Sequence, residues 1–338
     1  MTSQAVLLAN LGSPDQPDIP SVRRYLNQFL MDPYVIQLPW ILRRLIVSLF
    51  VLPTRPAKSA HAYQSIWTDA GSPLVSLSMD LLKAVQNRLS IPVGMSMRYG
   101  SPSIESELLR LAALPDIREI VFLPLYPHYA ESTVLTSIRE AERVISQHRL
   151  QIELVVPAPF YDRPQYIRAL VDSTRPWLEE EFDHVLFSYH GLPELHITKA
   201  DPTRVHCLKV KDCCNIPSPA HATCYRHQVM VTTGLFVEEA GLKQDQYSVS
   251  FQSRLGRAKW LEPSTEDVVI ELAGKGVKKL LVLCPAFVTD CLETLEEIEI
   301  QAAETFRQAG GEDLILIPCL NSHPAWVETL ATIVSGNH

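Results

Sequence analysis

His190 and a stripe of acidic residues are the side chains whose type and spacing point most directly to chemistry. His190 follows a short apolar run and directly precedes Gly191. Imidazole is the side chain best suited to exchanging protons near neutral pH. The same position also suits a loop histidine whose ring is satisfied by backbone groups. The pattern therefore leaves a catalytic and a structural role open for His190.

The acidic stripe lies in the segment 290–297, which reads DCLETLEE. Glu293 and Glu297 are four residues apart, so they share one face of a helix. Asp290 and Glu296 are further acidic candidates in the same segment. Such a stripe can bind a hard cation or relay protons, but the helix dipole also favours acids at a helix start. Both interpretations stay open.

Four of the seven cysteines fall in the pattern C-x5-C-C-x9-C, namely Cys207, Cys213, Cys214 and Cys224. The surrounding segment 195–227 has little helical or strand periodicity, and so long a connection usually needs a tie. Four thiolates can hold a [2Fe–2S] cluster or a tetrahedral zinc ion. The usual C-x₂₋₄-C zinc knuckles are absent, although a neighbouring histidine can replace a cysteine. These histidines are His206, His221 and His227. Disulfides and unconnected thiols also fit the pattern, but a reducing cytosol disfavours disulfides.

The elements that position these residues alternate along the chain. Short apolar runs predict strands at 5–9, 93–97, 120–124, 152–156, 184–189, 247–251, 279–284 and 314–318. Longer segments with helical period lie between them, which is typical of βαβ units and parallel sheets. Eight strands fit one (β/α) barrel or two doubly wound sheets. The irregular stretch 158–164 near the middle favours two sheets.

The predicted fold class is therefore α/β, with two doubly wound parallel-sheet domains and a ligand cleft between them. We expect an N-terminal domain at 1–157 and a C-terminal domain at 158–320, with the cysteine-rich loop at 195–227 inserted in the second. A final helix at 321–338 is expected to pack back on the N-terminal domain. The length of 338 residues suits two domains of this size.

Composition excludes several classes of protein. A hydrophobic fraction of 46% rules out a disordered chain, and a net charge of −8 argues against a nucleic-acid partner.

The first residues lack a basic export signal. The longest apolar stretch, 41–52, carries two arginines and lies between Pro39 and Pro53, so it is too short to span a bilayer. We expect a cytoplasmic protein.

Nine motifs occur in an order that resembles the ferrochelatase family throughout the chain. They are NLGSP at 10–14, VRRYLNQFL at 22–30, GSP at 71–73, LYPHY at 125–129, SYHGLP at 188–193, FQSRLG at 251–256, WLEP at 260–263, DCLETLEE at 290–297 and PCLN at 318–321. The resemblance implies a chelatase-like fold. It also implies insertion of Fe²⁺ into protoporphyrin IX with release of two protons, which gives protohaem at the last step of haem biosynthesis.

The same resemblance implies roles for individual residues. His190 and Glu293 match the catalytic pair that meets the substrate Fe²⁺, and Glu297 extends the acidic path. Porphyrin-pocket positions match Leu11, Arg98, Tyr99, Tyr126, Trp260 and Phe287. The clustered cysteines resemble the internal-loop arrangement of certain bacterial members, for which a [2Fe–2S] cluster is expected and zinc is the alternative.

The apolar segment 34–55 has two interpretations, a buried helix or a flexible lip over the porphyrin cleft. Its apolar residues together with Arg43 and Arg44 also suit contact with a membrane surface, which predicts peripheral association with the inner membrane. Alternative functions are insertion of metal into coproporphyrin or another tetrapyrrole, and non-catalytic haem binding or iron sensing.

Overall fold

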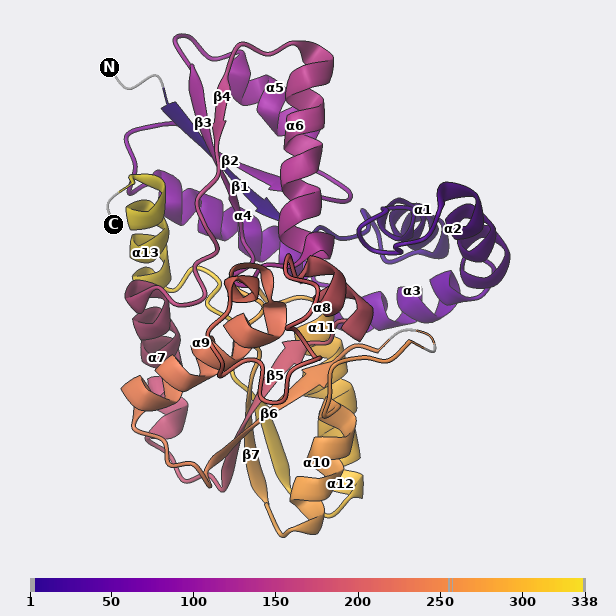
Figure 1. Cartoon of the computed structure of the whole chain (residues 1–338), viewed down its shortest axis with the longest axis vertical. Coiled ribbons are helices and arrows are strands. Elements are labelled where there is room, and N and C mark those ends of the chain that lie inside the picture. The colour runs from indigo at the N-terminus through magenta and orange to yellow at the C-terminus, as the bar shows by residue number, and fades with distance from the viewer. Residues whose placement is uncertain (1–3, 255, 257, 337–338) are drawn as a thin grey trace. The chain divides into compact units, whose positions relative to one another are not determined.

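The computed structural model describes residues 4–254, 256 and 258–336 (Figure 1). The chain divides into two compact units, each described here by itself. Unit 1 comprises Met1–Tyr126, Glu131–Ala158 and Val327–His338, and unit 2 comprises Pro127–Ala130 and Pro159–Trp326. The expected domain limits at 157 and 320, and the cleft between two domains, stay predictions.

The sheet of unit 1 is built from four parallel strands, β1 (Gln4–Asn10), β2 (Val93–Met97), β3 (Glu119–Pro124) and β4 (Glu153–Val155). Their order is β2-β1-β3-β4. The chain runs from β1 to β2 on one side and then crosses to β3 on the other. A doubly wound sheet with this order has its switch point beyond the carboxyl ends of β1 and β3. The loops that begin at residues 11 and 125 start there.

Helices cover the sheet of unit 1 and fill the connections between its strands. They are α1 (Ile19–Leu30), α2 (Trp40–Ile46), the π-helix η1 (Val47–Val51), α3 (Arg55–Ile66), α4 (Pro73–Gln86), α5 (Ile104–Ala112), the π-helix η2 (Glu131–Leu135) and α6 (Thr136–His148). Buried Leu7 and Phe122 on the sheet pack with Leu108 of α5 and Val144 of α6. The β1 run is buried on both faces, as expected for a central parallel strand.

The sheet of unit 2 repeats this plan. Its parallel strands are β5 (His184–His190), β6 (Tyr247–Gln252), β7 (Lys279–Leu283) and β8 (Asp313–Leu316), in the order β6-β5-β7-β8. The switch point of this sheet therefore lies beyond the carboxyl ends of β5 and β7. The histidine motif ends β5 and the acidic motif follows β7, so the topology alone brings the two together.

Both faces of the second sheet are covered. The helices of unit 2 are α7 (Pro164–Leu178), α8 (Glu194–Ala200), the 3-10 helix η3 (Pro219–Thr223), α9 (Tyr225–Ala240), α10 (Thr265–Gly274), α11 (Leu292–Thr294), the π-helix η4 (Leu295–Ala302) and α12 (Ala303–Gln308). On one face Leu186 packs in a cluster with Val269 of α10 and Phe306 of α12. On the other, Phe187 contacts Phe236 of α9 with ring centroids 5.2 Å apart. The last helix of the chain is α13 (Pro324–Val334).

The predicted fold class is confirmed: the chain is α/β with two four-stranded, doubly wound parallel sheets. The (β/α) barrel interpretation is wrong. All eight expected strands are present. The segment 195–227 was expected to lack regular structure, but α8 and η3 lie in it, and α3 was not expected. Within the described ranges, no helix is long and apolar enough to cross a membrane.

Candidate functional site

His190 is the last residue of β5, where the strand ends at the switch point of its sheet. Its neighbour in register on β6 is Gln252. The next residue, Gly191, donates its backbone N–H to the carbonyl oxygen of Gln252 at 2.7 Å. A Cβ at position 191 would lie 2.8 Å from that oxygen, so the chain needs glycine to turn here. Gly191 thereby fixes where the imidazole leaves the sheet.

The tautomer of His190 follows from its hydrogen bond. Its Nδ1 lies 2.6 Å from the carbonyl oxygen of Gly191. A carbonyl oxygen only accepts, so Nδ1 carries the hydrogen and the neutral ring keeps its lone pair on Nε2. Burial lowers the pKa of His190 below its usual 6.5, and this outweighs the opposing charge of Glu293. At neutral pH the ring is thus a base whose lone pair lies on Nε2.

Glu293 lies in α11, in the connection that follows β7. The side chain of Gln252 donates to the backbone carbonyl of Glu293 at 2.7 Å, and Ser188 donates to Gln252 at 2.7 Å. The Gln252 amide on β6 thus links β5 to the segment that follows β7. The ring of Phe287 lies 6.2 Å from the ring of His190. Unit 2 therefore brings together the histidine, the carboxylate and an aromatic ring.

Glu297 extends the acidic stripe by one turn. Ser253, which follows β6, donates its hydroxyl to the carboxylate of Glu297. The segment is a π-helix rather than the expected α-helix, and hydrogen bonds from residue i to i+5 still place residues four to five apart on one side. Short π-helical segments are frequent at functional sites.

Asp290 and Glu296 have other partners. The buried Asp290 carboxylate accepts from the Asn321 side chain at 2.7 Å and the Thr294 hydroxyl at 3.1 Å. It also accepts from the backbone N–H of Cys319 at 3.2 Å. Glu296 accepts from Gln301 at 2.6 Å. Asp290 holds the loop that presents Glu293, which is a structural role.

Two of the six expected porphyrin-binding residues belong to unit 2. Phe287 lies beside His190, as described. Trp260 pairs with Pro193 in a short antiparallel bridge, and a ring carbon of Trp260 comes within 3.4 Å of where a Cβ on Gly191 would be. Both aromatic side chains therefore lie near the turn that carries His190.

The other four come together at the carboxyl edge of the sheet in unit 1. The guanidinium of Arg98 pairs with the Asp32 carboxylate at 2.5 Å, and the Tyr99 hydroxyl donates to the same carboxylate at 2.9 Å. The backbone N–H of Tyr99 donates to the carbonyl of Leu11 at 2.8 Å. Burial raises the pKa of Tyr126, and the charge of Arg98 opposes that shift. Tyr99 is fully buried. Porphyrin contact by these residues stays a prediction.

The four clustered cysteines are neighbours in unit 2. Cys224 lies close enough to Cys207 and Cys214 to affect the pKa of both, and Cys213 affects that of Cys214. Burial raises the pKa of Cys207, and the neighbouring Cys224 thiol, together with burial, raises the pKa of Cys214. The thiols therefore form one continuous group. All seven cysteines are unpaired by disulfides in the described structure.

N–H groups point at two of these sulfurs. Arg226 donates to the Sγ of Cys214 at 3.3 Å, and the backbone N–H of Leu208 donates to the Sγ of Cys213 at 3.4 Å. The buried Asp201 carboxylate accepts the backbone N–H groups of His206 and Cys207 at 2.9 and 3.0 Å. The loop is thus held in place around the cysteines by polar contacts.

The expected substitute histidines contact backbone oxygens. Nε2 of His206 and of His221 lie 2.8 and 3.0 Å from the carbonyl oxygen of Cys213. Nδ1 of His227 lies 2.8 Å from the carbonyl oxygen of Cys214. The rings of His221 and His227 are stacked with centroids 3.6 Å apart. These imidazoles position the two adjacent cysteines. Among the residues that the structure describes, no group of three or more histidine, cysteine or acidic side chains is arranged to hold one metal ion.

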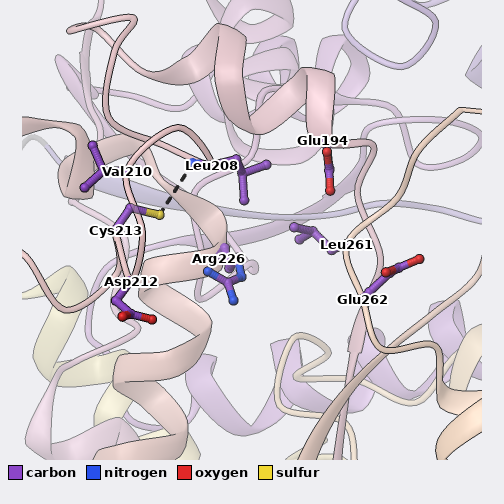
Figure 2. Close-up of a pocket in the computed structure, with 8 residues that line it drawn as sticks. All are labelled: Glu194, Leu208, Val210, Asp212, Cys213, Arg226, Leu261 and Glu262. Atoms are coloured by element: carbon purple, nitrogen blue, oxygen red, sulfur yellow. Dashed lines mark hydrogen bonds between the residues drawn. The ribbon is translucent and has the colours of Figure 1, made fainter.

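A pocket of about 260 Å³ opens beside the cysteines. Figure 2 shows its lining side chains, which are Glu194, Leu208, Val210, Asp212, Cys213, Arg226, Leu261 and Glu262. The bond from Leu208 to the Cys213 sulfur crosses one wall. The pocket therefore reaches Cys213 and the guanidinium of Arg226, and its lining includes neither His190 nor Glu293.

Comparison with known proteins now decides the family. The sequence profile named Ferrochelatase matches residues 3–338. The chain belongs to the ferrochelatase family. It is 58% identical over 335 residues to the ferrochelatase of Ectopseudomonas mendocina, with 98% of each chain covered. It is 57% identical to that of Pseudomonas fluorescens strain Pf0-1, again with 98% of each chain covered. This ferrochelatase is accordingly a metal-insertion enzyme of haem biosynthesis.

Solved structures support the fold of this ferrochelatase independently of sequence. The structure of SirB from Bacillus subtilis with Fe³⁺ aligns with a TM-score of 0.55 at 12% identity, covering 98% of this chain and 94% of SirB. At such low identity the likeness concerns the fold alone. It agrees with the two doubly wound sheets described above and confirms the chelatase-like architecture.

Sequence patterns did not reveal several residues that organise the site of this ferrochelatase. Asp32 holds Arg98 and Tyr99, Gln252 links the strand ends around Glu293, and Tyr225 donates its hydroxyl to the carbonyl of His190 at 2.9 Å. Of these residues only Gln252 lay in a recognised motif, FQSRLG. Asp32 and Tyr225 act on residues far away in the sequence, so no local pattern indicates their roles.

Proposed function

We propose that this ferrochelatase inserts Fe²⁺ into protoporphyrin IX, with His190 as the base that accepts pyrrole protons and Glu293 as its acidic partner. The observation that carries the proposal is the neutral imidazole with its lone pair on Nε2, placed beside Glu293 and Phe287 at the end of β5. Insertion replaces two pyrrole protons with Fe²⁺ and leaves iron in the same oxidation state. A site for this reaction needs a proton acceptor and an anionic exit path.

The residues divide this work by their chemistry. Nε2 of His190 can accept a pyrrole proton or bind the incoming Fe²⁺, because the bond to Gly191 engages only Nδ1 and leaves the lone pair on the other nitrogen. The Glu293 carboxylate stabilises the imidazolium that forms, and Glu297 continues the acidic path towards Ser253. Aromatic Phe287 and Trp260 offer flat apolar surface for a planar ring.

The test is anaerobic incubation of the purified protein with Fe²⁺ and protoporphyrin IX, following the loss of porphyrin fluorescence and the appearance of haem. We expect catalytic turnover. Parallel reactions with coproporphyrin test the alternative porphyrin substrate. A higher kcat/KM for coproporphyrin than for protoporphyrin IX would contradict the proposal. Bound porphyrin that stays fluorescent would support a carrier or sensor instead.

The rate should fall on the acidic side of neutrality. His190 acts in its neutral form, and its pKa lies below 6.5 because burial penalises the imidazolium. Metal insertion should therefore be insensitive to this group at and above pH 6.5 and should decline as pH drops through the lowered pKa. A profile of kcat/KM against pH checks this, with a Glu293→Gln variant expected to move the acidic limb further down. An acidic limb above pH 6.5 would contradict the assignment.

We propose that Cys207, Cys213, Cys214 and Cys224 hold a [2Fe–2S] cluster, with zinc as the alternative. These four thiolates would hold the cluster, which requires them to be neighbours. The proximity of Cys224 to Cys207 and Cys214 supports this donor set. The N–H groups that point at two of the sulfurs are also of the kind that stabilise cluster ligands. The cluster supplies one-electron redox chemistry when bound.

Removing the guanidinium beside Cys214 should lower the reduction potential of this centre. Arg226 donates to the Sγ of Cys214, and a cationic donor favours the more negative, reduced state. We expect Arg226→Leu to shift the potential down by about 60 mV, the change that a tenfold equilibrium effect gives in a one-electron couple. A dye-mediated redox titration measures it. Arg175→Leu, which removes an exposed arginine of the same unit, is the control. Equal potentials in the two variants would contradict the role.

We propose that the segment 34–55 rests on the cytoplasmic face of the inner membrane. Its apolar side chains are unusually exposed: 63% for Trp40, 62% for Leu49 and 73% for Phe50. The segment folds as α2 and η1, and Arg43 is turned inward, donating to the backbone carbonyls of Ile36 and Leu38. The exposure argues against the buried-helix interpretation. An apolar surface next to the exposed Arg44 suits the headgroup region of a bilayer.

Vesicle binding tests this location. The protein should sediment with vesicles of phosphatidylethanolamine and anionic phosphatidylglycerol, and a Trp40→Ser, Leu49→Ser, Phe50→Ser triple variant should stay in the supernatant. Burial of three large apolar side chains contributes several kcal/mol, so we expect at least a tenfold loss of partitioning. The control is Ile270→Ser, which removes another exposed apolar residue on α10. Equal sedimentation of the triple variant and the parent would contradict the proposal.

A further inference from the structure

Tyr225 connects two features that the sequence presents as separate. It is the first residue of α9 and directly follows Cys224, which occupies the N-cap position with an extended backbone. The Tyr225 side chain is buried, and its hydroxyl donates to the backbone carbonyl of His190 at 2.9 Å. Two consecutive residues thus carry a thiol of the cysteine group and a hydrogen bond to the backbone of His190.

Aromatic contacts hold Tyr225 in its position. The buried ring of His128 meets the ring of Tyr225 edge-on at 5.7 Å and the ring of Tyr189 at 5.5 Å. His128 is tied to α9 by a 2.9 Å hydrogen bond between its Nε2 and the hydroxyl of Thr232. Packed rings leave little freedom, so a shift at the start of α9 must move the Tyr225 hydroxyl.

The end of β5 is tied to α9 at a second point. The Tyr189 hydroxyl shares a 2.8 Å hydrogen bond with the hydroxyl of Thr233. Tyr189 and His190 are consecutive, so α9 contacts both of the residues that end the strand. Of the two contacts, the one from Tyr225 reaches the backbone of His190 itself.

The other side of this connection is the cysteine group. The Cys224 thiol is a neighbour of those of Cys207 and Cys214. A metal centre held by these thiols fixes Cys224, and adjacent Cα atoms are only about 3.8 Å apart, so it fixes the start of α9 as well. Apart from such a centre, the Cys224 backbone is held by its N–H bond to the carbonyl oxygen of His221 at 3.3 Å and by the bond that its carbonyl oxygen accepts from Gln228 at 3.1 Å.

We propose that Tyr225 is a positioning residue that couples occupancy of the cysteine site to the placement of His190. The proposal rests on the proposed roles of His190 and of the cysteines. It gives the cysteine site a function in the reaction without any electron transfer: the bound centre holds α9, and the Tyr225 hydroxyl holds the backbone from which the imidazole projects.

The first part of the test replaces the hydroxyl alone. Tyr225→Phe should keep the visible absorption of the cluster, lower kcat about tenfold and leave the KM for protoporphyrin IX unchanged, because porphyrin contacts are not touched. Tyr247→Phe is the matched control, since its hydroxyl bonds to Gln244 at the opposite end of β6. An unchanged kcat in Tyr225→Phe would overturn the proposal.

The second part measures coupling. Hydrogen exchange of a peptide covering His190 and Gly191 is followed in the parent and in Tyr225→Phe, before and after the cluster is removed by chelator and oxidant. Loss of the cluster should speed exchange in the parent and change it far less in Tyr225→Phe. Equal acceleration in both proteins would overturn the coupling. The proposal would also be overturned if the protein, purified without oxygen, contained no metal at the cysteines.

The exchange measurement separates this inference from the proposed function. It reports the backbone at His190 whether or not the imidazole is the base. If His190→Ala remained active, the catalytic assignment would fail while the exchange result still decided whether Tyr225 links the two places. Cluster removal from the folded holoprotein avoids reliance on a cysteine variant that does not fold.

Discussion

Replacing His190 with alanine should slow metal insertion at least about 100-fold, because the variant loses the neutral base placed at this edge of the sheet. The hydrogen bond from Nδ1 of His190 to the carbonyl oxygen of Gly191 fixes the tautomer, so the lone pair stays on Nε2. Fe²⁺-dependent loss of protoporphyrin fluorescence measures the rate. Fluorescence quenching of bound porphyrin by the variant should still give a dissociation constant close to that of the parent.

A matched histidine variant controls for this result. His184 begins the same strand, and its Nε2 contacts the hydroxyl of Ser248 at 3.0 Å. His184→Gln removes a mostly buried imidazole at the opposite end of β5, so it should retain the parental rate per folded molecule. A His190→Ala enzyme that turns over within a few-fold of the parent would rule out the base assignment. A large loss in His184→Gln would show that any disturbance of β5 inactivates the enzyme.

Replacing Cys214 with serine should remove the visible absorption of the cluster and lower the free energy of unfolding by about 3 kcal/mol. The stability loss has the size of the loop-closure entropy that a crosslink across such a loop removes from the unfolded chain. A hydroxyl is a poor ligand for soft iron–sulfur centres, so the remaining thiols lose the bound metal. Visible absorption, iron and sulfide analysis and urea unfolding measure the three consequences.

The control for this variant is Cys319→Ser. Cys319 lies apart from the cysteine group, beside the Asp290 carboxylate, and burial raises the pKa of its thiol. Its replacement should leave the visible absorption intact. If Cys214→Ser kept its colour and stability, the ligand assignment would be wrong. If it lost colour but bound zinc with unchanged stability, zinc would be favoured as the bound metal.

The sequence predicted the sheets well because parallel buried strands are short, apolar and locally encoded. The expected strand at 93–97 agrees with β2 to the residue, and the expected final helix at 321–338 contains α13. The helix α3 was missed because its residues are mostly small or polar, so the sequence shows no clear apolar face with helical period. The short α8 was missed because seven residues carry too little pattern.

The sequence predicted those residues of the candidate site that follow the carboxyl ends of strands. His190 and Glu293 meet because the carboxyl ends of β5 and β7 adjoin in the sheet. Which effect decides the charge of His190 was open from the sequence, because burial and the neighbouring carboxylate oppose each other. The folded structure resolves this in favour of burial. The contact of Tyr225 with His190 spans 35 positions in the chain, and no local pattern encodes it.

The two units share a strand order, and each has one connection between strands that is much longer than the others. In each unit the longest connection between strands follows the first strand: residues 11–92 join β1 to β2, and residues 191–246 join β5 to β6. The first carries the exposed apolar helix and the second carries the cysteine group. Neither connection contains a strand of the two four-stranded sheets. The exposed apolar helix and the cysteine group are therefore separate additions to the same plan, and a change in the length of either connection leaves the pairing of the sheet strands unchanged.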